Sequence, residues 1–209
     1  VTNLRTNQSE TQDIYFGEIP IMTERGSFIL NGVERIIINQ LVRSPGVYFT
    51  AIPYSGKNFF GASIIPLRGA WLEFQTELNN VISVRIDRRK KVPVTVLLKA
   101  FGIEGNKDLI KIFEDVDIYD ISYIETTLKK DETKNTQEAL IEIHSKLKPV
   151  ELSTLDNAVK FFESLFKDKS RYDLSWPGRY KINKRLDRNS KSLVLELDDI
   201  VLTVKEIIN

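Results

Sequence analysis

Cysteine is absent from the 209 residues of the chain, and histidine and methionine occur once each, as His144 and Met22. Without cysteine there is neither a disulfide framework nor a thiolate metal site, which fits a reducing compartment. A single histidine disfavours both a histidine-based metal site and a Ser-His-Asp triad. The sequence therefore offers few of the residues that metal-dependent and nucleophilic catalysis commonly use.

Long apolar runs are also missing. No stretch approaches the roughly 20 apolar residues that a membrane-spanning helix needs, and the N-terminus lacks the charged-then-apolar layout of a signal peptide. We therefore expect no membrane partner. Hydrophobic residues nevertheless make up 42% of the chain, which is enough to bury a core. Because the chain begins with Val1 and its only methionine is internal, we expect a piece of a longer protein.

The chain also has almost no net charge, since it contains 30 basic and 29 acidic residues. Nucleic-acid binding must therefore be sought in local clusters. One basic cluster spans residues 85–91; a second, residues 175–188, interleaves cations with Trp176 and Tyr180. Cations beside aromatic rings are typical of surfaces for single-stranded nucleic acid, but a merely solvated face explains each cluster equally well.

The first half of the chain has the pattern of antiparallel strands. Residues 14–22 resemble a short, interrupted strand, and Asn31-Gly32 predicts a hairpin turn between strands at 27–30 and 33–42. The sequence "RSPG" from Arg43 then ends this unit. Extended segments continue from Val47 to Lys99, where Pro93 precedes a short helix closed by Gly102.

Trp71 starts a run in which polar and apolar residues alternate. Trp71 shares one side with Glu73 and Gln75, whereas Leu72 and Phe74 take the other side. An indole on the polar side of a strand suggests a stacking partner. The alternative is that a neighbouring element covers it, which is the commoner fate of tryptophan.

The second half has helical periodicity. We expect helices at 136–147 with Thr136 as N-cap, at about 154–166 with Ser153 or Thr154 as N-cap, and at 198–209 with Asp198 or Asp199 as N-cap. Residues 169–192 are expected to form a loop. The fold class is therefore α+β, with antiparallel strands in the first half and a helical second half.

Candidate catalytic and metal sites are weak. Residues 115–120, "DVDIYD", lack the glycine and the distal glutamate of a calcium loop. No glycine-rich loop precedes a helix as phosphate binding requires. His144 lies among charged neighbours within a helical pattern, so a packing or solvated role is expected. We assign no catalytic residue and no metal ligand.

The segment "GEIPIMTERGSFILNGVERIIINQLVRSPGVYF" resembles the N-terminal part of the β subunit of bacterial-type, multisubunit DNA-directed RNA polymerase. The resemblance continues in the same order through "IIPLRGAWLEF", "VRIDRRKKVPVTVLLKAFG" and "LFKDKSRYDLSWPGRYKINKRL". It implies that residues 1–42 are part of the β protrusion, that residues 43–190 are the β lobe, and that residues 191–209 form a helix returning toward the protrusion.

The resemblance also implies functional residues. Arg43 and Trp71 match the family's pocket for the non-template strand of the transcription bubble, where Trp71 would stack on an unpaired base and Arg43 would help contact a flipped guanine. Other positions that match the DNA-facing side of the lobe are Asp87, Arg88, Lys91 and Arg179. Three residues match the rim of the rifamycin pocket: Arg35, Ile38 and Gln40.

The catalytic apparatus implied by the resemblance lies elsewhere. Mg²⁺ would be held by the β′ subunit, so this fragment needs no cofactor of its own and would act only as a subunit of a nucleotidyltransferase. The implied partners are DNA, as non-template strand and downstream duplex, the β′, α and ω subunits, and a sigma factor. The compact middle of the chain and its Lys-, Asn- and Ile-rich composition favour a plastid (chloroplast stroma), with the bacterial cytoplasm as alternative. A different class of function, a protein-interaction module whose basic loops bind an acidic partner, stays open.

Overall fold

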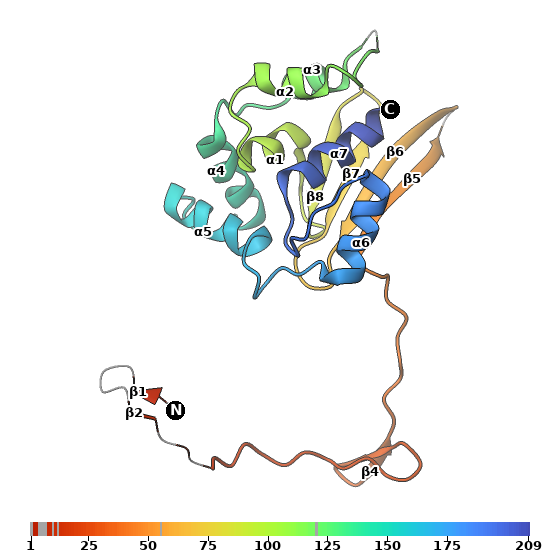
Figure 1. The fold of residues 1–209 in the computed structure, drawn as a ribbon, viewed down its shortest axis with the longest axis vertical. Helices are drawn as coiled ribbons and strands as arrows, with labels where there is room; N and C mark the ends of the chain where they lie inside the picture. Colours follow the sequence, from red (N-terminus) through yellow and green to blue (C-terminus); the bar gives the residue numbers. More distant parts are fainter. Residues whose placement is uncertain (1, 4–7, 10, 12, 55, 120) are drawn as a thin grey trace. The chain divides into compact units, whose positions relative to one another are not determined.

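A computed structural model describes the chain except for residues 1, 4–7, 10, 12, 55 and 120. The described chain divides into two compact units, Val1–Val42 and Arg43–Asn209. Both units are coloured by residue number in Figure 1.

The first unit contains two small antiparallel pairs. β1 (Thr2–Asn3) pairs with β2 (Gln8–Ser9), and β3 (Phe28–Leu30) pairs with β4 (Val33–Arg35). The predicted hairpin is confirmed, because Asn31 (φ 49°) and Gly32 (φ 76°) take the left-handed conformations of its two-residue turn.

The rest of the first unit has less regular structure than the sequence pattern predicted. The return strand ends at Arg35 rather than Val42, because the turn at residues 23–27 leaves β3 only three residues long and offers no further pairing partner. Residues 14–22, expected to form an interrupted strand, form none. Alternating apolar residues alone do not make a strand where no neighbouring strand accepts their backbone hydrogen bonds.

The second unit is built on a five-stranded antiparallel sheet in which each strand pairs with the next along the chain (Figure 1). Its strands are β5 (Gly46–Tyr54), β6 (Lys57–Ile65), β7 (Leu72–Thr76), β8 (Ile82–Ile86) and β9 (Lys91–Pro93). One face of β7 and β8 is buried through Leu72, Phe74, Ile82, Val84 and Ile86, none of them more than 3% exposed. This face forms one side of the core.

The opposite face of the sheet is the polar side of the same alternation. It presents Glu73 and Gln75 of β7, Arg85 of β8 and Lys91 of β9, which are exposed or half-buried. We call this surface the open face. The alternation predicted around Trp71 is therefore confirmed for Leu72 through Thr76.

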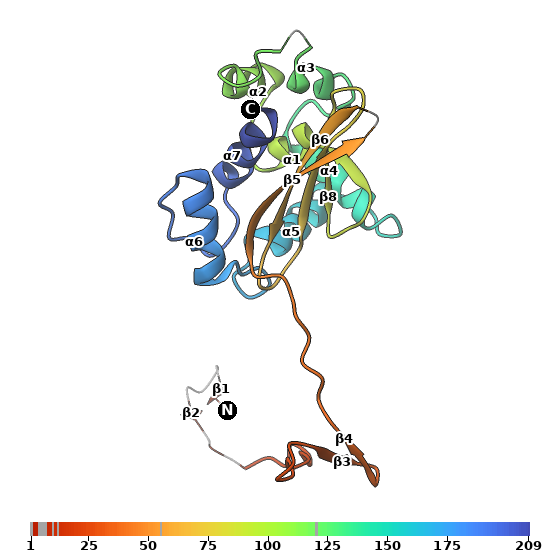
Figure 2. The same ribbon diagram turned by 90° about the vertical axis from the view of Figure 1, so that its right-hand side faces the viewer.

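Helices follow the last strand. They are α1 (Val94–Ala100), α2 (Asn106–Phe113), α3 (Tyr123–Leu128), α4 (Thr136–Leu147), α5 (Leu155–Phe166), α6 (Ser175–Leu186) and α7 (Leu197–Ile208). α1 contacts β8 and β9, whereas α7 contacts β6 (Figure 2). The predicted α+β class is confirmed. Among the helices of the described residues, none is both long enough and apolar enough to cross a membrane.

Several helix ends differ from prediction. Asn135, not Thr136, caps α4, because its side-chain oxygen accepts a hydrogen bond from the Glu138 amide. Thr154 caps α5 as predicted. The N-cap of α7 is Glu196, which forms a capping box with Asp199.

α6 occupies the segment predicted to be a loop. Pro177 is compatible with this helix, because it lies in the first helical turn, where its missing N–H costs no intrahelical hydrogen bond. α7 packs within the second unit, because Ile200, Val204, Ile207 and Ile208 are buried in its core.

Candidate nucleic-acid interface

The sheet register brings together candidate residues that are far apart in the sequence. Gly46 pairs with Ile65, Ile64 pairs with Leu72, and Leu72 pairs with Ile86. The start of β5, the start of β7 and the end of β8 therefore share one end of the sheet. Arg43, Trp71, Asp87 and Arg88 all lie at or just beyond this end, which we call the Trp71 end.

Trp71 is half-buried beneath an arginine. The guanidinium carbon of Arg88 lies 4.5 Å from the centre of the indole ring, and its Nε lies 4.0 Å from the carboxylate of Glu73. The Asp87 amide donates a 2.8 Å hydrogen bond to the carbonyl of Trp71. The sequence left open whether a neighbouring element covers Trp71. The structure shows that Arg88, a flexible side chain, covers the indole.

The turn that carries Arg88 is strained. Asp87 and Arg88 both have left-handed backbones, with φ of 53° and 57°, and the Arg89 amide closes the turn on the carbonyl of Ile86 at 3.1 Å. Such a turn prefers Asn-Gly or Asp-Gly, and a left-handed non-glycine residue costs on the order of 1–2 kcal/mol. The structure tolerates this cost at the turn that holds Arg88 over Trp71.

Arg89 anchors the same turn from the other side. Its Nη1 donates a 2.6 Å hydrogen bond to the carbonyl of Leu147 at the end of α4. Arg89 is therefore a structural residue rather than a free cation of the basic cluster. This contact leaves Arg88 and Lys90 of the turn on the surface.

Lys91 is partly neutralised by acidic neighbours on the open face. Its Nζ lies 3.2 Å from the carboxylate of Glu77, which Lys130 also approaches at 3.7 Å. Burial tends to raise the pKa of Glu77, but hydrogen bonds from Ser83 and Lys91 outweigh it, so the pKa is lowered and the group stays ionised.

Arg43 lies beside a turn that is held from two sides. The Tyr48 hydroxyl donates a 2.6 Å hydrogen bond to the carbonyl of Ser44. Pro45 packs so closely on α6 that a Cβ added to Gly178 would lie 2.7 Å from the Pro45 Cβ. The Arg43 side chain is exposed and, within the described part of the chain, has no hydrogen-bond or ion-pair partner. A constrained turn thus presents an uncommitted cation.

Arg179 is a correction to the predicted DNA-facing set. Its side chain is 1% exposed. Nε donates to the carbonyl of Ser192 at 2.5 Å, Nη2 to the carbonyl of Val194 at 2.7 Å, and Nη1 to the carboxylate of Asp199 at 2.7 Å. A guanidinium that is enclosed and fully engaged in this way cannot reach a phosphate, so the prediction of a surface role for Arg179 is wrong.

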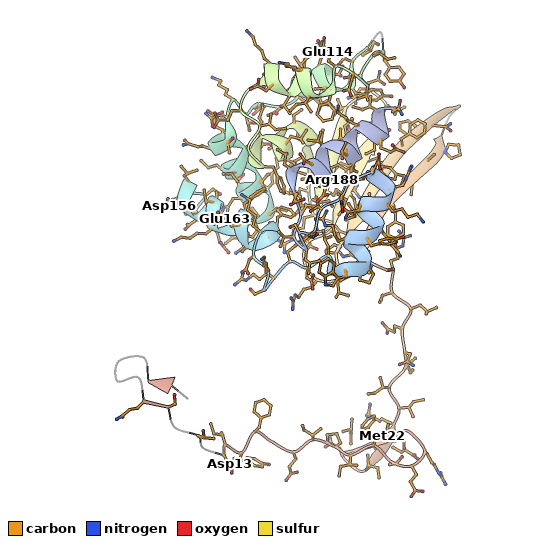
Figure 3. All side chains as sticks on the ribbon, in the orientation of Figure 1. Asp13, Met22, Glu114, Asp156, Glu163 and Arg188 are labelled. Atoms are coloured by element: carbon orange, nitrogen blue, oxygen red, sulfur yellow. The ribbon has the colours of Figure 1, made fainter. Side chains whose placement is uncertain are left out.

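Asp199, which the sequence patterns did not single out as a partner, joins two arginines. Arg188, in the loop that follows α6, also donates to its carboxylate. Figure 3 labels Arg188 on the second unit. Burial raises the pKa of the neighbouring Tyr172 hydroxyl, and the Asp199 charge adds to that effect. The second basic cluster therefore contributes Arg179 and Arg188 to an internal ionic network that fastens α6 to α7.

The remainder of that cluster is exposed on α6. Trp176 and Tyr180, four residues apart, are 64% and 65% exposed, with Lys181 and Lys184 exposed beside them in sequence. Arg185 is committed elsewhere, since it pairs with Glu206 and lies over the ring of Phe49.

The residues matched to the rifamycin rim lie in the first unit. Arg35 ends β4, whereas Ile38 and Gln40 lie in a segment without regular structure, and Ile38 is 77% exposed.

The only histidine has a packing role, as expected. His144 is 1% exposed, its Nδ1 lies 2.9 Å from the Ser153 hydroxyl, and its ring meets Phe161 edge-on. In the acidic run at 115–120, Asp117 accepts hydrogen bonds from Ser122, Tyr123 and Ile124 at the start of α3. The described residues contain no group of three or more acidic or histidine side chains placed to hold a metal ion.

Comparison with known proteins places this fold in a family. The model for RNA polymerase Rpb2, domain 2, matches residues 43–209, the range of the second unit. The chain therefore belongs to the RNA polymerase Rpb2, domain 2, family.

The relatives found are named DNA-directed RNA polymerase subunit beta. The protein of Listeria monocytogenes is 49% identical over 185 residues, which cover 88% of this chain and 15% of the relative. That of Geobacillus kaustophilus is 44% identical over 209 residues, covering 99% of this chain and 17% of the relative. The protein of Clostridium kluyveri is 46% identical over 185 residues, which cover 88% of this chain and 15% of the relative. The chain thus spans about a sixth of these bacterial relatives, and its resemblance to part of a β subunit is confirmed.

Proposed function

We propose that the chain acts as a part of the β subunit of DNA-directed RNA polymerase, with residues 1–42 in the protrusion and the second unit as the lobe. Its role there is to form one wall of the DNA cleft and to contact the non-template strand of the transcription bubble. Family membership and the named relatives support the subunit assignment. The nucleotidyl transfer itself belongs to the assembled enzyme, with Mg²⁺ held by β′ and with α, ω and a sigma factor as further partners.

The observation that carries the DNA-facing role is the Trp71–Arg88 pair at the Trp71 end. An exposed cation–π contact is worth about 0.5–1 kcal/mol, whereas stacking of a base on an aromatic side chain is worth about 1–3 kcal/mol. An unpaired base can therefore displace Arg88 from the indole with a net gain. The displaced guanidinium then becomes available for a phosphate oxygen.

The neighbouring residues have separate roles in this proposal. Arg43 presents a cation from its constrained turn and helps to contact an extruded guanine. Asp87 offers an exposed carboxylate at the Trp71 end, and Lys91 adds positive charge toward the strand. Arg35, Ile38 and Gln40 are proposed for the rim of the rifamycin pocket.

The test uses a complete polymerase that contains this chain within its β subunit. Trp71→Ala is expected to shorten the lifetime of the open complex on a fork template by about 5- to 150-fold, which corresponds to 1–3 kcal/mol. Trp176→Ala, which removes an exposed indole on α6, serves as the matched control and should change the lifetime less than twofold. An unchanged lifetime for Trp71→Ala would refute the role proposed for this residue.

A second candidate function is a module that binds an acidic protein partner. The exposed face of α6, with Trp176, Tyr180, Lys181 and Lys184, supports it, because aromatic residues dominate many protein interfaces. Binding to a DNA bubble, to duplex DNA and to a glutamate-rich peptide over a range of salt concentrations separates the two functions. Preference for the peptide would favour the second.

The cellular location is also a proposal. The three relatives named above are bacterial proteins, so they support the bacterial cytoplasm and give no support to the plastid.

A further inference from the structure

The open face carries a groove lined by residues of β5 to β9, among them Thr50, Gly61, Gln75, Ser83 and Arg85. Glu73, which also lines the groove, lies two residues after Trp71 and therefore on the same side of the chain. A side chain at Gly61 would lie 2.8 Å from the carbonyl of Phe74, so a glycine keeps this floor at the level of the backbone.

The far end of the groove is apolar. Ile52 of β5 and Leu78, which follows β7, line a hollow there and are 56% and 66% exposed. Exposed large aliphatic side chains around a hollow mark a surface that a ligand can cover. The open face thus has an indole near the start of β7 and an aliphatic hollow near its end.

The charge on this face is unbalanced in favour of cations. Glu73 is approached by Arg88 at 4.0 Å, and Glu77 is paired with both Lys91 and Lys130. Arg85 sits in register between Glu73 and Lys91. It is exposed, and among the described residues it makes no hydrogen bond or ion pair. An uncompensated guanidinium therefore lines the groove.

The distance from the indole of Trp71 to the hollow at Leu78 fits a short single strand. From Trp71 to Leu78 the chain advances seven residues, or about 24 Å at about 3.4 Å per residue. Single-strand binding folds of the smallest class cover about 4 nucleotides. An acidic peptide is a poorer match, because only one cation of the face is uncommitted and a sheet face offers no free backbone groups for strand addition.

We propose that the open face is a track for about 4 nucleotides of unpaired DNA, continuing from the base stacked on Trp71. Arg85 contacts a phosphate in the middle of the track, and the hollow of Ile52 and Leu78 accepts a base at its far end. This inference rests on the proposed function, since it extends the same single-strand site and names its length and its contacts.

The test uses the full chain with Trp176→Phe, which leaves Trp71 as the only tryptophan. Quenching of Trp71 fluorescence is measured with oligothymidylates of two to eight nucleotides at several salt concentrations. Affinity should rise with length up to about four nucleotides and then level off. Arg85→Ala should weaken binding of the longer oligomers about fivefold and lower the salt slope by about 0.7, the value for one phosphate contact on a single strand.

Matched variants distinguish the outcomes. Leu78→Ser should weaken the tetramer but not the dimer, and Lys184→Ala, an exposed cation on α6, should change neither. If Trp71 is quenched but Arg85→Ala and Leu78→Ser leave the length dependence unchanged, the track is refuted while the stacking site stands. If no oligomer quenches Trp71, the proposed function fails as well. Stronger binding of a glutamate-rich peptide to the Arg85 face than of DNA would also overturn the track.

Discussion

Replacement of Arg179 by methionine tests whether this residue is structural. Methionine retains most of the apolar stem and removes the guanidinium. The substitution leaves the Ser192 carbonyl without its donor and the Val194 carbonyl with the Ser192 hydroxyl as its remaining donor. It also leaves the buried Asp199 with Arg188 as its remaining cationic partner. The change therefore acts on the connection between α6 and α7.

The expected cost follows from these contacts. Removing one partner of a buried ion pair costs about 3–5 kcal/mol, and each buried carbonyl left unsatisfied costs about 1–3 kcal/mol. Because Arg188 still compensates part of the Asp199 charge, we expect a loss of about 4 kcal/mol in the free energy of unfolding. Domains of this size are stable by about 5–15 kcal/mol, so the loss is a large fraction of the total.

Urea denaturation followed by far-UV circular dichroism measures this loss. Within the described residues, the helices all lie in the second unit, so the helical signal reports on that unit. With a slope of about 2 kcal/mol/M, the midpoint should fall by about 2 M. Lys184→Met, on the exposed side of the same helix, should shift it by less than about 0.3 M. A loss below about 1 kcal/mol for Arg179→Met would refute the structural role.

Three further predictions concern other contacts. Burial tends to raise the pKa of Asp131, but hydrogen bonds from Thr133 and Lys99 outweigh this effect, so the pKa is lowered. The ionised Asp131 therefore stabilises the fold above about pH 4, and this contribution is lost as the pH falls further. Asp131→Asn should flatten this part of the curve of stability against pH. Gly178→Ala should lower the midpoint of thermal unfolding by several degrees, because the new Cβ would lie 2.7 Å from the Cβ of Pro45. Gly56→Ala is the control that measures backbone strain alone, because its Cβ would meet nothing within 4 Å while Gly56 has a positive φ. Arg88→Gly should relieve a left-handed residue and stabilise the turn by up to about 1 kcal/mol, while acrylamide quenching of Trp71 increases because its cover is gone; unchanged quenching would contradict the observed stacking.

Local sequence signals predicted the structure correctly where interactions within a few residues determine it. Asn31-Gly32 specifies a hairpin turn because both residues tolerate positive φ. The alternation from Leu72 to Thr76 specifies which side of β7 is buried. Trp71 was correctly placed on the polar side of this pattern, but its cover by Arg88 depends on a turn sixteen residues later and could not be read from the pattern.

Long-range contacts account for what sequence patterns missed. The position of α6 was obscured by Pro177 and Gly178, although Pro177 is compatible with a first helical turn. Had the helix been recognised, the spacing of Arg179, Ile182 and Leu186 would have placed all three on one buried face. Asp199, the ion-pair partner of Arg179, lies 20 residues further along the chain. No local sequence rule pairs these two residues.

The central claim is that the Trp71 end recognises unpaired DNA, and direct binding tests it. The full chain with Trp176→Phe is titrated with a DNA bubble and with a duplex of the same sequence, with Trp71 fluorescence as the signal. The bubble should bind about 5- to 150-fold more tightly, as expected for one stacked base. With Trp71→Ala, followed by fluorescence anisotropy of labelled DNA, this preference should fall by about 5- to 150-fold, the contribution of the stacked base. Equal affinity for bubble and duplex, or a preference that Trp71→Ala leaves undiminished, would contradict the claim.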